Sequence, residues 1–225
     1  MMRSMNEDQI ANNIAQVRQT VRLAAENCQR ELHEITILAV SKTRPAADLR
    51  EACRCGLTAF GESYLQEALE KIEQLQDLPL SWHFIGPIQS NKTRAIAAHF
   101  DWVHSVSRLK VARRLSEQRP AGMRPLQTCL QVNISGEASK SGARLDELPE
   151  LVAQVRELPG LQLRGLMTIP AANPDFALQR QAFAALRTAF EDLRAGPAPE
   201  LDTLSMGMSG DLRAAIAEGS TMVRV

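Results

Sequence analysis

The chain has 225 residues, which is enough to bury one substantial core and short for two. Its 26 basic and 26 acidic side chains cancel, so no net field draws it toward nucleic acid or an anionic membrane. No apolar run approaches the roughly 18 residues that a membrane-spanning helix needs. We therefore expect one domain over residues 1–225 that binds a small molecule, with neither nucleic acid nor membrane as a partner.

The cysteines and histidines indicate the compartment and argue against a metal. The start of the chain lacks an apolar signal core, and the four cysteines include no CxxC pair, so we expect a cytoplasmic protein with reduced thiols. The four histidines show no metal-ligand spacing. His83 and His104 lie in apolar stretches and are interpreted as core or rim histidines, and no metal site is expected.

The first predicted elements are a helix, a strand and a second helix. Apolar residues recur with a helical period within residues 1–33, which predicts a long opening helix. The β-branched run at residues 35–40 is too short for a helix and predicts a strand. Pro45 and Gly56 then mark the start and the stop of the next helix.

The same alternation of a short apolar run and a helix-like segment recurs to the end of the chain. Further runs bring the number of predicted strands to eight, and they occupy residues 57–60, 82–85, 102–106, 127–134, 162–169, 201–205 and 221–225. Eight such units favour a closed barrel over an open doubly wound sheet. We predict an α/β fold, a single (β/α)8 barrel of the triosephosphate isomerase type, with the opening helix packed on it where an eighth helix would lie.

Lys42 is the first candidate site residue. It stands two residues after the first predicted strand, and in such barrels the working groups lie at the C-terminal ends of the strands. Apolar walls there would favour the neutral, nucleophilic amine that forms a Schiff base. A rim lysine paired with a carboxylate fits the same position equally well. Lys71 and Lys110 lie in charge-rich helical stretches and are expected to be solvated.

A second candidate site lies between the seventh predicted strand and the helix that follows it. The segment contains Ser205, Gly207, Met208 and Ser209, whose small neighbours let backbone N–H groups approach an anion at a helix N-terminus. The loops after the seventh and eighth strands are the usual phosphate site of this fold. The alternative is an ordinary capped turn, because Ser209 and Asp211 are also common helix-start residues.

Short motifs spread over nearly the whole chain carry a family resemblance. They read Val40-Ser-Lys-Thr43, Phe60-Gly-Glu-Ser-Tyr-Leu-Gln-Glu67, His83-Phe-Ile-Gly-Pro-Ile-Gln-Ser-Asn-Lys92, Asn133-Ile-Ser135, Ser139-Lys-Ser-Gly142, Leu163-Arg-Gly-Leu-Met167, Ser205-Met-Gly-Met-Ser209 and Ser220-Thr-Met-Val-Arg224. In combination they resemble the pyridoxal 5'-phosphate (PLP) homeostasis protein family. The resemblance, and not the periodicity, names PLP as the cofactor.

The resemblance implies a fold and a set of cofactor-binding positions. The fold is the alanine racemase-like barrel of fold-type III PLP proteins, and Lys42 matches the lysine that holds PLP as a Schiff base. The segment from Ser205 to Ser209 matches the phosphate-binding positions, and Arg224 matches the arginine that faces the pyridine nitrogen. The remaining implied cofactor contacts are Ser63, His83 and Met167.

The implied function is PLP homeostasis, in which the protein holds PLP and affects its supply to apo-enzymes and the amino-acid balance. No turnover is assigned to the family, so we assign no catalytic residue and expect a carrier or regulator, in monomeric form. Two alternatives remain: a PLP-dependent amino-acid racemase or related enzyme, and a cofactor-free Schiff-base aldolase. An arginine at the ring nitrogen weakens the ring as an electron sink, and Tyr64 is the only tyrosine, which disfavours two-base racemisation.

Two departures from the family pattern stand out. Ser63 occupies a position where the family usually has asparagine, which we expect to weaken one polar contact near the ring. The family also continues with Gly-Thr beyond the position of Val225, and those residues would give backbone N–H groups to the phosphate. Two alternatives stay open: PLP is held less tightly, or the two residues follow the end of this sequence in the whole protein. We assign no role to Lys92 or Lys140.

Overall fold

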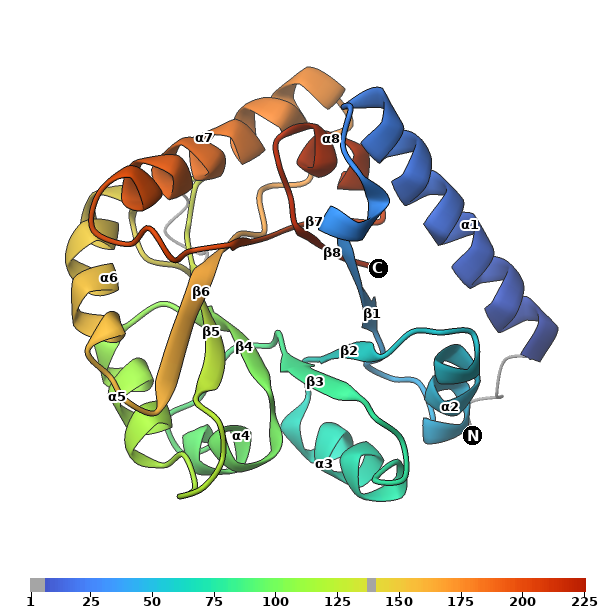
Figure 1. Cartoon of the computed structure of the whole chain (residues 1–225), viewed down its shortest axis with the longest axis horizontal. Coiled ribbons are helices and arrows are strands. Elements are labelled where there is room, and N and C mark those ends of the chain that lie inside the picture. Colours follow the sequence, from blue (N-terminus) through green and yellow to red (C-terminus); the bar gives the residue numbers. More distant parts are fainter. Residues whose placement is uncertain (1–6, 137–140) are drawn as a thin grey trace.

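Eight parallel strands form a closed barrel in which each strand pairs with the next and β8 pairs with β1 (Figure 1). The computed structural model describes residues 7–136 and 141–225. The strands are β1 (Thr36–Val40), β2 (Ala59–Glu62), β3 (Ser81–Phe84), β4 (Trp102–Val106), β5 (Leu126–Gln131), β6 (Leu161–Met167), β7 (Thr203–Met208) and β8 (Met222–Arg224). The predicted α/β barrel is confirmed.

Helices surround the barrel on its outside (Figure 1). Those that follow strands are α2 (Ala46–Arg54), α3 (Leu65–Gln74), α4 (Thr93–His99), α5 (Leu109–Glu117), α6 (Leu148–Arg156), α7 (Phe176–Ala195) and α8 (Leu212–Ala217). Two short 3₁₀ turns, Leu32–Glu34 and Leu145–Glu147, precede β1 and α6. In the described part of the chain, no helix is long and apolar enough to cross a membrane.

The opening helix α1 (Glu7–Asn27) completes the ring of helices between α8 and α2 (Figure 1). Its buried residue Val21 packs in one cluster with Leu212 and Ile216 of α8 and with Val223 of β8. These contacts follow from the helical period of its apolar residues, which places them on one face.

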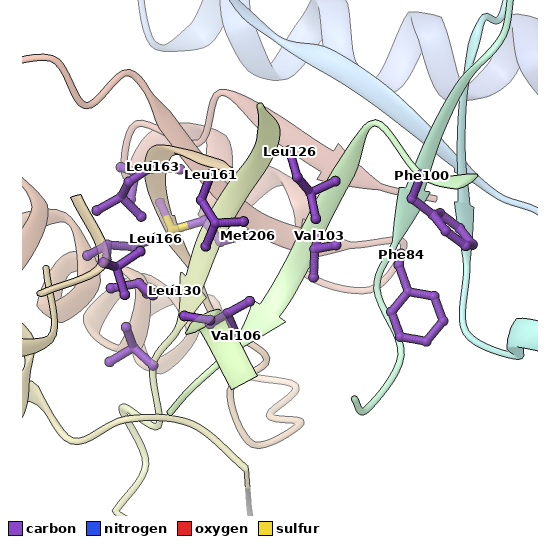
Figure 2. Packing of buried hydrophobic residues seen from close by; sticks show 14 of the residues in the cluster. Phe84, Phe100, Val103, Val106, Leu126, Leu130, Leu161, Leu163, Leu166 and Met206 are labelled. Atoms are coloured by element: carbon purple, nitrogen blue, oxygen red, sulfur yellow. The ribbon is translucent and has the colours of Figure 1, made fainter. Parts of the chain in front are cut away.

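The main hydrophobic core lies between the outer face of the barrel and the helices. Figure 2 shows part of it, including Val103 of β4, Leu126 of β5 and Leu166 of β6, each fully buried. Phe183 of α7 belongs to the same cluster. Each such side chain stabilises the fold by about 1.5–3 kcal/mol on burial, so this layer fixes the positions of the strand ends that carry the site.

The interior of the barrel, by contrast, contains polar side chains. His104 of β4 lies 2.8 Å from Ser205 of β7, measured from Nδ1 to Oγ. Because β4 and β7 are not neighbours in the barrel, this hydrogen bond crosses its interior. The closed sheet of the barrel therefore surrounds a polar centre.

Candidate functional site

Three of the predicted site segments meet at the C-terminal mouth of the barrel. Lys42 follows β1, Arg224 ends β8, and the loop from Gly207 to Asp211 begins at the end of β7. Because β7, β8 and β1 are consecutive in the barrel, these segments are side by side although they are far apart in sequence. This is the end at which barrels of this type carry their functional groups.

Lys42 stands in a tight turn at this mouth and is exposed. The turn is closed by a hydrogen bond from the backbone N–H of Arg44 to the carbonyl of Ser41, at 3.1 Å. Lys42 itself makes no ion pair or hydrogen bond with the residues that the structure describes. Among these residues no carboxylate pairs with Lys42, as the alternative of a paired rim lysine would require. Its amine is therefore available to a ligand.

An ionic group, here called the clamp cluster (Ser41, Glu62, Glu67 and Lys71), lies beneath this turn, and all of its members except the half-buried Glu67 are buried. The Lys71 Nζ donates to Glu62 Oε1 at 2.7 Å, to Glu67 Oε1 at 2.6 Å and to the Ser41 carbonyl at 2.6 Å. The Ser41 hydroxyl donates to Glu62 Oε1 at 2.7 Å. Burial raises the pKa of Glu62, although Lys71 and Ser41 act in the opposite direction.

The prediction that Lys71 is solvated is wrong, since only 4% of it is exposed. The residue lies on the face of α3 that turns toward β1 and β2, where two carboxylates and a carbonyl satisfy its ammonium group. Paired in this way, a charged lysine can be buried despite the cost of removing it from water. Lys110, predicted in the same way, is exposed as expected.

Arg224 is buried at the end of β8 and is held by β7 beside it and by the residue that follows β6. Its Nη1 donates to the carbonyl of Ser205 at 2.7 Å and to its hydroxyl at 3.0 Å, and Nη2 donates to the Thr168 carbonyl at 2.9 Å. An arginine has five N–H donors, so Nε–H and one Nη2–H have no acceptor among the described residues. Burial lowers the pKa of Arg224 to about 10, and the guanidinium therefore stays protonated at neutral pH.

Arg224 is one end of a chain of hydrogen bonds, here called the interior cluster (Arg224, Ser205, His104 and His83). His104 Nε2 lies 3.0 Å from His83 Nδ1, and His83 Nε2 lies 3.1 Å from the hydroxyl of Ser81. Burial lowers the pKa of His83 to about 3 and that of His104 well below its ordinary value, so both rings are neutral. A neutral ring has one donor and one acceptor nitrogen, which matches its two partners in this chain.

The end of β7, with Gly207 and Met208, and the loop that follows it present free backbone donors at the mouth. Gly207 has a φ of +94°, and a Cβ there would lie 2.5 Å from the Cβ of Ala215, so only glycine fits. The N–H of Met208 donates to the Asp211 carboxylate at 2.6 Å. The N–H groups of Ser209 and Gly210 are exposed and donate to no acceptor in the described residues. They can hold an anion.

Three other predicted contacts are buried in the barrel. Ser205 is fully buried within β7, and its hydroxyl is engaged by Arg224 and His104 rather than free for a phosphate. His83 lies two side chains away from Arg224. Met167 is fully buried at the end of β6, beside Ser205 in register.

Ser63 lies at the mouth, on the far side of β1 from Arg224. It follows β2, and a Cβ at Gly86 would lie 2.3 Å from its carbonyl oxygen, so the β3 loop packs closely on its backbone. Lys92 is exposed before α4. Ser139 and Lys140 lie outside the described residues.

Sequence reasoning missed several residues that shape this site. Thr168 holds Arg224 through its carbonyl, and His104 connects Ser205 to His83. Of the clamp cluster, only the spacing of Glu67 and Lys71, four residues apart, gives a sequence signal for an ion pair on a helix. In the described ranges, no group of three or more His, Cys, Asp or Glu side chains could hold a metal ion.

A cavity of about 250 Å³ lies beside the mouth and outside the barrel wall. Apolar side chains line most of it, among them Ile14 and Val17 of α1, Ile37 of β1 and Leu49 of α2. None of the predicted site residues lines this cavity. We therefore place the candidate site at the mouth and not in this cavity.

Comparisons with known proteins identify the family and support the fold. The family model described as the alanine racemase N-terminal domain matches residues 5–225. A pyridoxal phosphate homeostasis protein of Pseudomonas aeruginosa is 61% identical over 216 residues, which are 96% of this chain and 92% of that protein.

Two solved structures are similar to the chain as well. PipY of Synechococcus elongatus, solved with PLP bound, is 38% identical, with a TM-score of 0.82 over 96% of this chain and 97% of PipY. Alanine racemase of Corynebacterium glutamicum has a TM-score of 0.68 at 17% identity, over 98% of this chain and 59% of the racemase, which supports the fold alone.

Proposed function

Because this chain belongs to the pyridoxal phosphate homeostasis proteins of the alanine racemase N-terminal domain family, we propose that it binds PLP at the barrel mouth. Its role is then to hold PLP and to affect the supply of the vitamin to apo-enzymes. The observation that carries the proposal is the exposed, unengaged amine of Lys42, in the turn after the strand that pairs with the strand of Arg224. A structure of PipY, a 38% identical relative, contains PLP, which supports the same ligand here.

The described residues match the chemistry of PLP group by group. PLP supplies an aldehyde carbon that condenses with a primary amine. Lys42 offers that amine, and the N–H groups of Ser209 and Gly210 offer donors for the phosphate. The unused N–H groups of Arg224 are donors for the ring nitrogen.

Arg224 also argues for a carrier rather than a fast enzyme. A guanidinium that donates to the ring nitrogen keeps that nitrogen unprotonated, which weakens the ring as an electron sink. With a pKa of about 10, the guanidinium keeps its proton at neutral pH and does not transfer it to the ring. Tyr64, the only tyrosine, is 57% exposed beside β2 and makes a poor second base.

The compartment and assembly belong to the same proposal. All four cysteines, Cys28, Cys53, Cys55 and Cys129, have free thiols, which suits the reducing cytoplasm. We place the protein there as a monomer, with apo-enzymes that need PLP as its recipients.

A PLP titration tests the proposal directly. The purified protein should develop a visible absorption band that disappears on borohydride reduction, and peptide mapping should find the label on Lys42. Lys42→Ala should abolish the band, whereas Lys92→Ala, which removes an exposed lysine between β3 and α4, should leave it. A colourless protein, or a label on another lysine, would contradict the proposal.

The enzyme alternative has its own test. The PLP-loaded protein is incubated in D₂O with a panel of amino acids, and deuterium at the α-carbon is followed by NMR. We expect exchange no faster than with free PLP. Brisk exchange with any one amino acid would overturn the carrier assignment.

A further inference from the structure

The turn that carries Lys42 contains a strained residue. Thr43 has a φ of +64°, in the left-handed region. It is the third residue of the Ser41–Arg44 turn, a position that in such turns normally requires glycine or asparagine. A β-branched residue there is a genuine outlier, and such outliers persist only where the surrounding structure holds them.

The clamp cluster holds this turn from both sides of Lys42. The backbone N–H of Thr43 donates to Glu67 Oε1 at 2.5 Å, and the same oxygen accepts from the Lys71 ammonium group. On the other side, Ser41 is bound through its hydroxyl by Glu62 and through its carbonyl by Lys71. Both neighbours of Lys42 are thus fixed to the clamp cluster, whereas the Lys42 side chain has no partner among the described residues.

The cluster has a second reading, as an ion pair that only fastens α3 to the barrel. That reading explains the bond between Lys71 and Glu62, which joins the helix to β2. It does not explain why Glu67 accepts from the one backbone N–H that follows Lys42, nor why the turn adopts a conformation that costs energy. Fixing the direction of the Lys42 side chain accounts for both.

We propose that Glu67 is a positioning residue for Lys42, which acts with Lys71 and Glu62 to hold the Ser41–Arg44 turn in its left-handed form. The inference rests on the proposed role of Lys42 as the PLP anchor. Held in this way, the Lys42 side chain starts from a backbone that points it into the mouth. Released, Thr43 returns to a negative φ and Lys42 leaves the orientation that suits PLP.

The test compares Glu67→Ala with wild type in two measurements. The first is the rate at which the PLP-loaded protein loses its absorption band in excess hydroxylamine. Removing one hydrogen bond to a charged acceptor should speed the loss by about tenfold. The second uses PLP-free protein, in which hydrogen exchange at the Thr43 amide should also become faster by about tenfold.

Two further variants separate positioning from simple destabilisation. Thr43→Gly in the Glu67→Ala background should return the rate of PLP loss toward wild type, because glycine adopts a positive φ without help. If Glu67 only stabilised the fold, Thr43→Gly would not restore the rate of PLP loss. Glu70→Ala removes an exposed glutamate from the same helix and should leave both measurements at wild-type values.

The outcomes distinguish this inference from the proposed function. Wild-type rates of PLP loss in Glu67→Ala, or no rescue by Thr43→Gly, would overturn the positioning role. If wild type forms no band with PLP, or Lys42→Ala keeps it, the anchor assignment fails instead. The exchange of the Thr43 amide needs no PLP, so an unchanged exchange rate in Glu67→Ala overturns the clamp in either case.

Discussion

The two buried polar clusters at this mouth are stabilised in opposite ways. The interior cluster contains two neutral histidines and one arginine, joined by single hydrogen bonds across the barrel. The clamp cluster outside the barrel wall contains two carboxylates and one backbone carbonyl at 2.6–2.7 Å from the ammonium group of Lys71. In the first, burial determines the protonation state of the rings. In the second, the charge of Lys71 opposes the effect of burial on the pKa of Glu62.

The difference separates two tasks. Neutral groups can be packed inside the barrel at little electrostatic cost, and they orient Arg224 without competing for its charge. An ion pair is expensive to bury, and breaking it is more expensive still, so it makes a firm clamp for the Lys42 turn. The two clusters should therefore respond differently to mutation and to pH.

The largest expected effect is that of Lys71→Ala. It leaves Glu62 buried without its partner, which should lower the free energy of unfolding by about 3–5 kcal/mol at pH 7. The loss should shrink at pH 5, where Glu62 takes up a proton more easily. Urea unfolding measures both, with the exposed Lys110→Ala as control. If both substitutions lower the free energy of unfolding equally, the ion pairs of the clamp cluster do not stabilise the protein.

The pH dependence of stability should have opposite signs in the two clusters. For His83 the unfolded state binds a proton below pH 6.5 and the folded state does not until about pH 3. Stability should thus fall as the pH falls through this window, by about 1.4 kcal/mol per pH unit. The raised pKa of Glu62 works the other way: its contribution is present below its ordinary value of 4.5 and is lost as the pH rises.

Urea unfolding of three proteins across this pH range checks both signs. Compared with wild type, His83→Gln should lose less stability between pH 6.5 and pH 4.5. Glu62→Gln should instead remove a loss that develops above pH 4.5. An identical pH slope in wild type and His83→Gln would show that the interior ring is not held neutral.

A smaller effect is expected from Ser205→Ala. It removes an acceptor from Arg224 and a partner from His104, which should lower the free energy of unfolding by about 1–3 kcal/mol. Ser209→Ala changes an exposed hydroxyl of the same strand–loop segment and should stay within about 0.5 kcal/mol of wild type. If both serines behave alike in urea unfolding, the interior cluster does not depend on Ser205.

The smallest expected effect is that of Thr43→Gly in the PLP-free protein. Relief of the left-handed conformation outweighs the extra chain entropy of glycine, for a gain of about 0.5 kcal/mol. Thr58→Gly, at an exposed position without a positive φ, should destabilise by about the same amount. Thermal unfolding of both variants checks the sign, and a loss of stability in Thr43→Gly would argue against strain at the turn.

The strand pattern could be predicted closely because it depends on local apolar runs. Residues 102–106 were predicted as a strand and form β4, and residues 35–40 contain β1. The seventh run was predicted at residues 201–205, whereas β7 extends from Thr203 to Met208. The pairing of β7 with β8 shifts register between Ser205 and Met208, and an irregularity of that kind cannot be read from apolar periodicity.

The sequence alone determined the eight alternating units, the positions of Lys42 and Arg224 at strand ends, and the glycine of the loop after β7. These follow from short-range patterns, since side-chain periodicity and turn chemistry act over a few residues. Only the tertiary structure decided that Lys71 is buried, that Ser205 faces the barrel interior and that Thr43 is held by Glu67. Each of those depends on desolvation and on partners from other elements, which exist only after the barrel has closed.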